Sequence, residues 1–268
     1  MQYVSRGKPV PATITTPART ESRDMPLVLM AHGHGGTRDE AGAFVAVATE
    51  LAKQGIASLR MDFPGCGENT AAFSENNLTH MLIDLDAGLE FGLQELAIDP
   101  RRVAILGYSM GARVAILSTR KRDYQAMVLW APVGLDGAES IYPFLGGESS
   151  WKAMKRQATE HGHALLVTQW GDRQELGLQW FADMETSQPE SVISGFEAAV
   201  QMIHGLDDSV VVPENSRRLR VAATAARSAD LLLIPGADHG LGFYSDQPEI
   251  SGQVIEATVS FLVRELLK

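Results

Sequence analysis

The feature that most constrains the fold is the pentapeptide Gly107-Tyr108-Ser109-Met110-Gly111, which has the form G-x-S-x-G. The preceding segment, RVAILGYS, has the apolar run of a buried strand, and the following segment, MGARVAILSTRK, is typical of a packed helix. A residue in so sharp a turn has a strained backbone, and side chains two positions away would collide with the strand and the helix. The two glycines remove this collision. The pattern therefore predicts a strand–turn–helix that presents the Ser109 hydroxyl as a nucleophile beside a helix N-terminus.

Patterns with three fixed positions in five also occur by chance. Chance matches seldom fall where a strand changes into a helix, so the context of Ser109 favours the functional interpretation.

Short apolar runs alternate with amphipathic stretches along most of the chain. This alternation is typical of βαβ units and predicts an α/β fold with a mostly parallel central sheet flanked by helices. We expect strands at 26–33, 56–67, 102–109, 126–133, 198–205 and 229–236, and helices at 44–55, 78–97, 110–121 and 249–267. The last three strands have the apolar composition of central strands.

The alternation is interrupted between about residues 134 and 195, where glycine, polar and aromatic residues mix. A stretch of this length is too long for an ordinary loop. We therefore predict a core formed by residues 1–133 and 196–268, and an inserted cap formed by residues 134–195.

Length and charge exclude several classes of function. The chain of 268 residues fits one α/β domain with an insertion, or at most two small domains. Its formal charge of −10 argues against nucleic-acid and anionic-membrane partners. A single cysteine, Cys66, allows no internal disulfide, and residues 1–25 contain no apolar signal region. We expect a cytoplasmic protein, although the sequence leaves open whether a signal peptide has been removed.

A serine hydroxyl needs a base within hydrogen-bond reach to act as a nucleophile. Among seven histidines, only His239 lies in a glycine-rich loop late in the chain, after the last predicted strand. The imidazole in turn needs a carboxylate that orients it. The segment IHGLDDSVVVP follows another strand and offers two neighbours, Asp207 and Asp208.

At these three motifs the sequence resembles the α/β-hydrolase superfamily, and the resemblance covers nearly the whole chain. Serine esterases of this superfamily often have the motif H-G-x-x-D-x-x-V around the aspartate that orients the histidine. This frame implies Asp208 for that role and leaves Asp207 as the alternative. The order Ser109, Asp208, His239 matches that of the superfamily. We expect His204, at the end of the strand, to be structural and satisfied by nearby backbone.

The resemblance also implies an oxyanion hole. Backbone N–H groups of this kind stabilise the oxyanion that forms when a carbonyl is attacked. One donor is the N–H of Met110, after the nucleophile, and the other is the N–H of His34 in the segment HGHGG. A metal site at His32 and His34 is disfavoured because no carboxylate or cysteine set accompanies them.

The segment DFPGCGEN resembles the D-x-x-G-x-G segment of the superfamily, in which a histidine often stands where this chain has Cys66. No base or second thiol lies near Cys66 in the sequence, so we expect a small packing residue.

The predicted cap resembles the small cap of bacterial cinnamoyl (feruloyl) esterases. The segment ALLVTQWGDRQELGLQWFADM, residues 164–184, has the pattern of a hairpin followed by a short helix. The resemblance implies a cap that binds an aromatic acid. The candidate substrate contacts are Gln169, Trp170, Asp172 and Asp183, each of which could instead be ordinary packing or surface.

These features predict a serine carboxylesterase that acts through an acyl-enzyme on small or aromatic, hydroxycinnamate-type esters, with no cofactor and no metal. A serine peptidase or thioesterase on the same scaffold is the alternative, although Glu139 and Glu148 do not form the glutamate pair with which peptidases hold an amino terminus. A non-catalytic protein is disfavoured by the complete triad, and a haloalkane dehalogenase by the serine at the turn. The expected partner is a small ester, and the oligomeric state, for example a homodimer, stays open.

Overall fold

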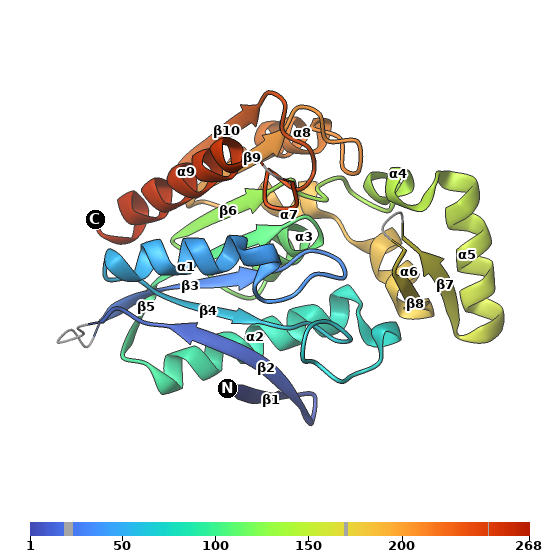
Figure 1. Ribbon diagram of the computed structural model, residues 1–268, viewed down its shortest axis with the longest axis horizontal. Coiled ribbons are helices and arrows are strands. Elements are labelled where there is room, and N and C mark those ends of the chain that lie inside the picture. The colour runs from blue at the N-terminus through green and yellow to red at the C-terminus, as the bar shows by residue number, and fades with distance from the viewer. Residues whose placement is uncertain (19–23, 169–170, 246) are drawn as a thin grey trace.

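The computed structural model describes residues 1–18, 24–168, 171–245 and 247–268 (Figure 1). Its main sheet has the strand order β1-β2-β4-β3-β5-β6-β9-β10. The strands are β1 (Gln2–Ser5), β2 (Lys8–Thr15), β3 (Met25–Ala31), β4 (Ala57–Met61), β5 (Ile98–Tyr108), β6 (Ala126–Trp130), β9 (Ala199–Gly205) and β10 (Ser228–Ile234). From β4 to β10 neighbouring strands are parallel. The predicted α/β fold is confirmed.

Two strands at the amino terminus were not predicted. They form an antiparallel hairpin, and β2 pairs antiparallel with β4. The hairpin turn is Arg6-Gly7, and both residues have positive φ, 51° and 70°, as tight hairpin turns require. The strand β2 contains Pro9 and Pro11. Because proline is rare inside sheets, the sequence pattern did not indicate a strand there.

The apolar run of β10 predicted a central strand, and this prediction was wrong. Within the described residues, β10 lies at the edge of the sheet and pairs with β9. The apolar run has another cause. Leu231 packs on the core cluster of one sheet face and Leu232 on that of the other face, so both sides of this edge strand are partly covered.

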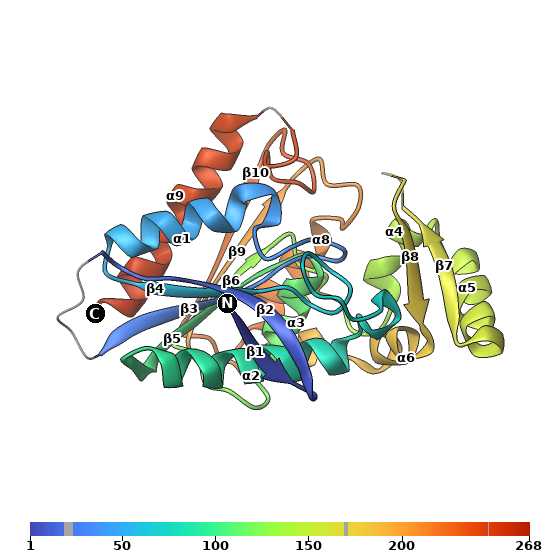
Figure 2. The same ribbon diagram turned by 60° about the horizontal axis from the view of Figure 1, so that its bottom comes forward.

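Helices cover both faces of the sheet (Figure 2). The helices α1 (Ala43–Lys53) and α9 (Pro248–Leu266) pack together on one face, and α2 (Leu78–Glu95), α3 (Met110–Ser118) and α8 (Glu214–Ala222) lie on the other. The predicted helices 44–55, 78–97, 110–121 and 249–267 all have a counterpart here. The short helices η1 (Glu40–Gly42) and η2 (Phe73–Glu75) lie in the loops after β3 and β4.

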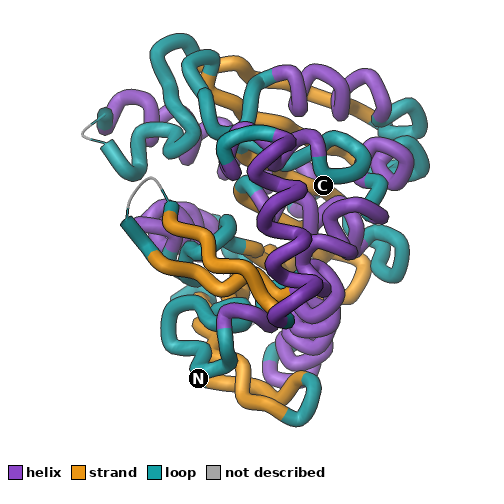
Figure 3. Tube along the Cα trace, turned by 90° about the vertical axis from the view of Figure 1, so that its right-hand side faces the viewer, coloured by secondary structure: helices purple, strands orange, loops and turns teal. Residues whose placement is uncertain are grey.

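Between β6 and β9 the chain forms a further group of elements, most of which lie beyond the carboxyl ends of the central strands (Figure 1). The last of them, α7 (Pro189–Ile193), packs on α3 and α8. The others are η3 (Glu139–Ile141), α4 (Tyr142–Leu145), α5 (Glu148–His161), β7 (His163–Val167), β8 (Arg173–Gly177) and α6 (Leu178–Thr186). The strands β7 and β8 form an antiparallel sheet of their own (Figure 3). The predicted cap, residues 134–195, corresponds to this segment, called the insertion below.

One buried arginine joins the two ends of the insertion to α3. The guanidinium of Arg113 donates to the carbonyls of Val133 and Gly137 where the chain leaves the sheet, and to Ser187 Oγ where it returns. Arg113 is fully buried, and burial lowers its pKa to about 9. The helix that follows Ser109 is thus also the support of the insertion.

Within the described residues, every helix is too short or too polar to cross a membrane.

Candidate active site

Ser109 lies at a strained turn between β5 and α3. Its φ of 53° and ψ of −113° lie outside the regions that a side chain favours. A Cβ on Gly107 would lie 2.4 Å from the carbonyl oxygen of Gly111, and one on Gly111 would lie 2.0 Å from the carbonyl oxygen of Ala31. The glycines are therefore required by close backbone approach, for the steric reason that the sequence suggested.

The backbone around Ser109 is anchored on two sides. Its N–H donates to the carbonyl of Trp130 at 2.8 Å, and its own carbonyl accepts the N–H of Val133 at 3.2 Å. Both partners lie at the end of the neighbouring strand β6. These bonds hold the backbone of the strained turn in place.

The structure brings Ser109, His239 and Asp208 together. His239 Nε2 lies 3.0 Å from Ser109 Oγ, and His239 Nδ1 lies 2.7 Å from Asp208 Oδ2. The side chain of Asp208 is fully buried and that of His239 is 13% exposed. The hydroxyl, imidazole and carboxylate form one continuous line of hydrogen bonds.

The carboxylate of Asp208 accepts four hydrogen bonds. The N–H groups of Val210 and Val211 reach Oδ1 at 2.9 and 2.8 Å, and both His239 and His204 reach Oδ2. Burial works against the ionised form, but the hydrogen bonds from the two imidazoles outweigh it and hold the pKa of Asp208 well below its usual range. Asp207 is exposed, and its N–H donates to the carbonyl of Ala237.

The prediction that nearby backbone satisfies His204 was incomplete. His204 Nε2 does contact the carbonyl of Val211 at 2.7 Å, but it also lies 3.1 Å from Asp208 Oδ2. His204 Nδ1 contacts Ser216 Oγ at 2.7 Å. The spacing of four residues between His204 and Asp208 gave no hint of this contact, because the chain turns between them.

The loop after β3 holds one peptide group in a defined orientation beside Ser109. The carbonyl of Gly33 accepts hydrogen bonds from His32 Nδ1 at 2.7 Å and from the N–H of Gly36 at 3.1 Å. The C=O and N–H of a trans peptide point in opposite directions. The N–H of His34 therefore points away from both donors, and in the described residues it donates to no backbone carbonyl.

The tautomer of His32 follows from its contacts. His32 Nε2 accepts the N–H of Phe63 at 3.0 Å, so the proton lies on Nδ1 and is donated to Gly33. Burial lowers the pKa of His32 to about 4, which keeps the ring neutral near neutral pH. His32 thus supports the loop and leaves no nitrogen for a metal.

Glu40 is a site residue that sequence reasoning missed. Its buried carboxylate accepts the N–H of Gly33 at 2.8 Å through Oε2 and the hydroxyl of Tyr244 through Oε1. Burial raises the pKa of this carboxyl. Glu40 thereby joins the loop beside Ser109 to the loop that carries His239. An acid just before a helix is usually explained by the helix dipole, so its sequence position gave no signal.

The sequence model of the alpha/beta hydrolase family matches residues 28–250, well over half of the chain. The chain belongs to the alpha/beta hydrolase family. An uncharacterized protein of Mycobacterium tuberculosis is 28% identical over 216 residues, which are 80% of this chain and 63% of that protein. The chain thus spans less than two thirds of the length of that relative.

Two solved structures show how widely this hydrolase fold is shared. Est1E from Butyrivibrio proteoclasticus, with ferulic acid bound, has a TM-score of 0.78 at 20% identity, and the alignment covers 100% of both chains. A soluble variant of the monoglyceride lipase from Saccharomyces cerevisiae, in complex with a substrate analogue, has a TM-score of 0.76 at 16% identity over 99% of this chain and 94% of that one. At these identities the likeness shows the fold alone.

In this alpha/beta hydrolase, the ring of His34 lies among aromatic side chains from three parts of the chain. Its ring centroid is 5.4 Å from those of Phe73 and Phe144 and 6.0 Å from that of Trp180. His34 Nε2 also lies 2.8 Å from Gln174 Oε1 in β8. Burial lowers the pKa of His34 to about 4. The insertion therefore contacts the loop beside Ser109 through apolar and polar groups together.

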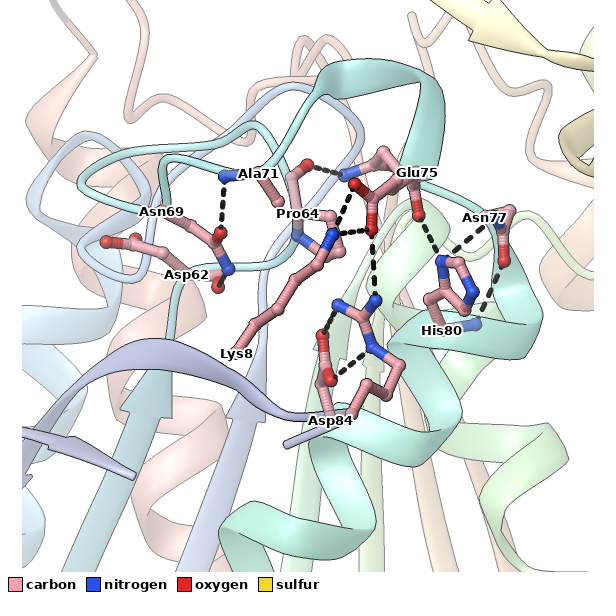
Figure 4. Close-up of polar contacts among 11 residues, drawn as sticks. Lys8, Asp62, Pro64, Asn69, Ala71, Glu75, Asn77, His80 and Asp84 are labelled. Atoms are coloured by element: carbon pink, nitrogen blue, oxygen red, sulfur yellow. Dashed lines mark hydrogen bonds and ion pairs between the residues drawn. The ribbon is translucent and has the colours of Figure 1, made fainter. Parts of the chain in front are cut away.

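The loop between β4 and α2, which carries Phe73, is held by hydrogen bonds within itself and to β2 (Figure 4). Asn69 Nδ2 donates to the carbonyl of Asp62 at 2.9 Å, and Lys8 Nζ lies 2.6 Å from Glu75. The N-cap residue Asn77 accepts the N–H of His80 at 2.9 Å and begins α2. Cys66 lies buried in this loop, where burial raises the pKa of its thiol to about 12 and makes it a poor nucleophile.

The candidate substrate contacts of the insertion have mixed outcomes. Gln169 and Trp170 lie outside the described residues. Asp172 is exposed in the turn between β7 and β8. Asp183 accepts hydrogen bonds from the N–H and hydroxyl of Thr79, so its carboxylate joins α6 to the start of α2. Gln174, which the sequence analysis did not single out, contacts the ring of His34.

The described residues contain no group of three histidine, cysteine, aspartate or glutamate side chains arranged to hold a metal ion.

Proposed function

We propose that the chain is a carboxylic ester hydrolase in which Ser109 is the nucleophile, His239 the general base and Asp208 the residue that orients the base. One observation carries this proposal: the line from Ser109 Oγ through His239 to Asp208, with distances of 3.0 and 2.7 Å, at a strained turn before a helix. Nucleophile and base within hydrogen-bond reach, with a third group holding the base, are the requirements of nucleophilic acyl transfer.

The proposed reaction has two halves. Ser109 Oγ attacks the ester carbonyl carbon while its proton moves to His239 Nε2. The tetrahedral intermediate collapses, the carbon–oxygen bond to the alcohol breaks, and the alcohol leaves with that proton. Water then attacks the acyl-enzyme in the same way and releases the acid and Ser109. Asp208 stabilises the imidazolium that forms in each half.

We assign the oxyanion to the N–H groups of His34 and Met110. Met110 is the first residue of α3, so its N–H is one of those that a helix leaves without an internal partner. The N–H of His34 belongs to the same peptide group as the carbonyl of Gly33, which is already held by two hydrogen bonds. This N–H therefore need not reorient when negative charge develops on the substrate oxygen. A site with two aligned donors favours the transition state over the planar ester.

For the acyl group we propose a small or aromatic acid of the hydroxycinnamate type. Phe73, Phe144 and the buried Trp180 gather around His34, whose N–H is the assigned donor. A flat ring bound beside the oxyanion would meet the aromatic surface of the half-buried Phe73 and Phe144. Est1E, which shares the fold, binds ferulic acid, and this also supports the proposal of an aromatic acyl group.

The test compares p-nitrophenyl acetate, methyl ferulate, a thioester and an aminoacyl nitroanilide on the wild type and on Ser109→Ala. We expect ester turnover that falls at least about 10³-fold in Ser109→Ala, and covalent labelling of Ser109 by an organophosphonate. The matched control is Ser118→Ala, a buried serine at the far end of the same helix, which should keep both properties. Faster amide or thioester turnover would replace the ester assignment with a peptidase or thioesterase.

A further inference from the structure

Asp208 Oδ2 is shared by two imidazoles. His239 Nδ1 lies 2.7 Å from this oxygen and His204 Nε2 lies 3.1 Å from it. The side chains of His204 and Asp208 are both fully buried. The mechanism proposed above uses His239 alone, so the contact of His204 with the same oxygen needs an explanation.

The contacts of His204 decide where its proton lies. Nε2 faces two groups that only accept hydrogen bonds, the ionised Asp208 and the carbonyl of Val211, so Nε2 carries a proton. At the other nitrogen, Ser216 Oγ lies 2.7 Å from Nδ1, and a hydroxyl can donate there. His204 therefore donates to Asp208 through Nε2, while Ser216 contacts its other nitrogen.

Two backbone donors also hold Asp208 in place. The N–H groups of Val210 and Val211 hold Oδ1, and they belong to the same tight turn as Asp208. His204 differs from them because it contacts Oδ2, the oxygen that His239 also contacts, so it acts on the charge of that oxygen. A donor on a carboxylate oxygen reduces the attraction of that oxygen for a second donor.

We propose that His204 is a positioning residue of the relay that acts through Asp208: its Nε2–H shares Oδ2 with His239 and limits the negative charge that His239 meets. The inference rests on the proposed function, because it assigns His239 as the base. A base works best when its pKa lies near the working pH. A carboxylate oxygen with fewer donors would favour the protonated imidazole more strongly, and a protonated imidazole cannot accept the proton of Ser109.

Other titratable groups also face this site. Glu40 is close enough to His239 for their charges to interact, Tyr108 donates to the carbonyl of His239, and Tyr244 donates to Glu40. Asp207 and Asp238 are exposed neighbours along the chain. From α8, the uncharged Ser216 faces His204, and the neighbouring Asn215 accepts the N–H of Gly134. The substitutions below leave every group except His204 and Ser216 unchanged.

The test measures the pKa of His239 by NMR titration of the imidazole nitrogens, with the acid limb of the pH profile of kcat/KM as a second readout. His204→Phe removes the donor, and we expect the pKa of His239 to rise by about one unit. His204→Gln places an amide donor near the position of Nε2 and should restore a value close to the wild type. Ser216→Ala, the matched control, removes only the far contact and should shift the pKa of His239 far less than His204→Phe.

A fall or no change in the pKa of His239 in His204→Phe would overturn the inference, because a purely structural role predicts a misplaced Asp208 and a weaker attraction for the imidazolium. If His204→Phe does not fold, His204→Leu, which is smaller and also lacks a donor, gives the same comparison, with the same rise in the pKa of His239 expected and a fall or no change overturning the inference. The NMR titration needs no turnover. A failure of the proposed function, with equal activity in Ser109→Ala, is therefore distinct from a failure of this inference.

Discussion

Two adjacent aspartates after β9 have opposite environments. Asp208 is buried with four hydrogen-bond donors around its carboxylate, whereas Asp207 is exposed. An asparagine at position 208 would have a neutral amide in place of the carboxylate. Its N–H group could face His239 Nδ1 and stabilise the wrong tautomer of the base. Asp208→Asn should therefore lower kcat by about 10⁴-fold.

Asp207→Asn is the matched control for this prediction and should keep kcat within a factor of about three. Steady-state kinetics on a p-nitrophenyl ester would measure both variants. If kcat fell further in Asp207→Asn than in Asp208→Asn, the assignment of Asp208 as the carboxylate that orients His239 would be wrong.

A second residue-scale prediction concerns pH and the ring of His34. Its pKa is lowered by burial to about 4 in the folded chain, against about 6.5 in an unfolded chain. The folded state therefore binds fewer protons than the unfolded state between these values. The stability from the neutral ring is complete above about pH 6.5 and is lost as the pH falls toward about 4.

His34→Phe should remove this dependence, because phenylalanine does not titrate. Between neutral pH and about pH 5 the free energy of unfolding should fall by about 2 kcal/mol less in the variant than in the wild type. Urea unfolding at the two pH values measures the difference. His161→Phe, at an exposed position, should lose as much as the wild type. An equal loss in His34→Phe would contradict a neutral buried ring.

At the scale of elements, the strand–turn–helix around Ser109 depends on backbone contact. A Cβ on Gly111 would overlap the carbonyl oxygen of Ala31 in β3, whereas one on Gly252 in α9 would meet open space. Gly111→Ala should therefore lower the free energy of unfolding by more than about 3 kcal/mol or prevent folding.

Gly252→Ala should raise the free energy of unfolding by about 0.5 to 1 kcal/mol, since alanine favours a helix more than glycine does. Chemical denaturation of both variants tests the pair. A mild effect of Gly111→Ala would show that α3 can move away from β3, and the steric account of the turn would then fail.

Other elements show the limits of sequence patterns. The apolar run of β10 predicted a central strand, yet its two faces are covered at the edge of the sheet. The hairpin of β1 and β2 was hidden by prolines. In both cases the place of the strand depends on which other strands and helices it packs against, and a local pattern does not contain this information.

At the scale of the whole molecule, the insertion and the sheet share one apolar cluster. Trp151 and Trp180 of the insertion belong to the same buried cluster as Leu27 and Leu29 of β3. Arg113 binds both ends of the insertion to α3. The two parts should therefore unfold together.

Equilibrium urea unfolding tests this expectation. Tryptophan fluorescence reports mainly on the insertion, which holds three of the four tryptophans, and far-UV circular dichroism reports on the whole chain. The two transitions should have the same midpoint. An earlier fluorescence transition would show that the insertion unfolds alone.

The fold class and the candidate residues Ser109, Asp208 and His239 could be predicted from the sequence. The steric needs of a sharp turn and the periodicity of strands and helices are local properties of the chain, so they are visible within a few residues. The choice of Asp208 over Asp207, and the order of the three motifs, came from the resemblance to the α/β-hydrolase superfamily.

Glu40, His204 and Gln174 could be placed only by the tertiary structure. Each has its meaning through a partner from another element or across a turn: Glu40 through Gly33 and Tyr244, His204 through Asp208, and Gln174 through His34. Hydrogen bonds between buried groups depend on distances of a few tenths of an ångström. Such distances arise from how whole elements pack, so a buried polar side chain gains its role only when the fold brings its partner to it.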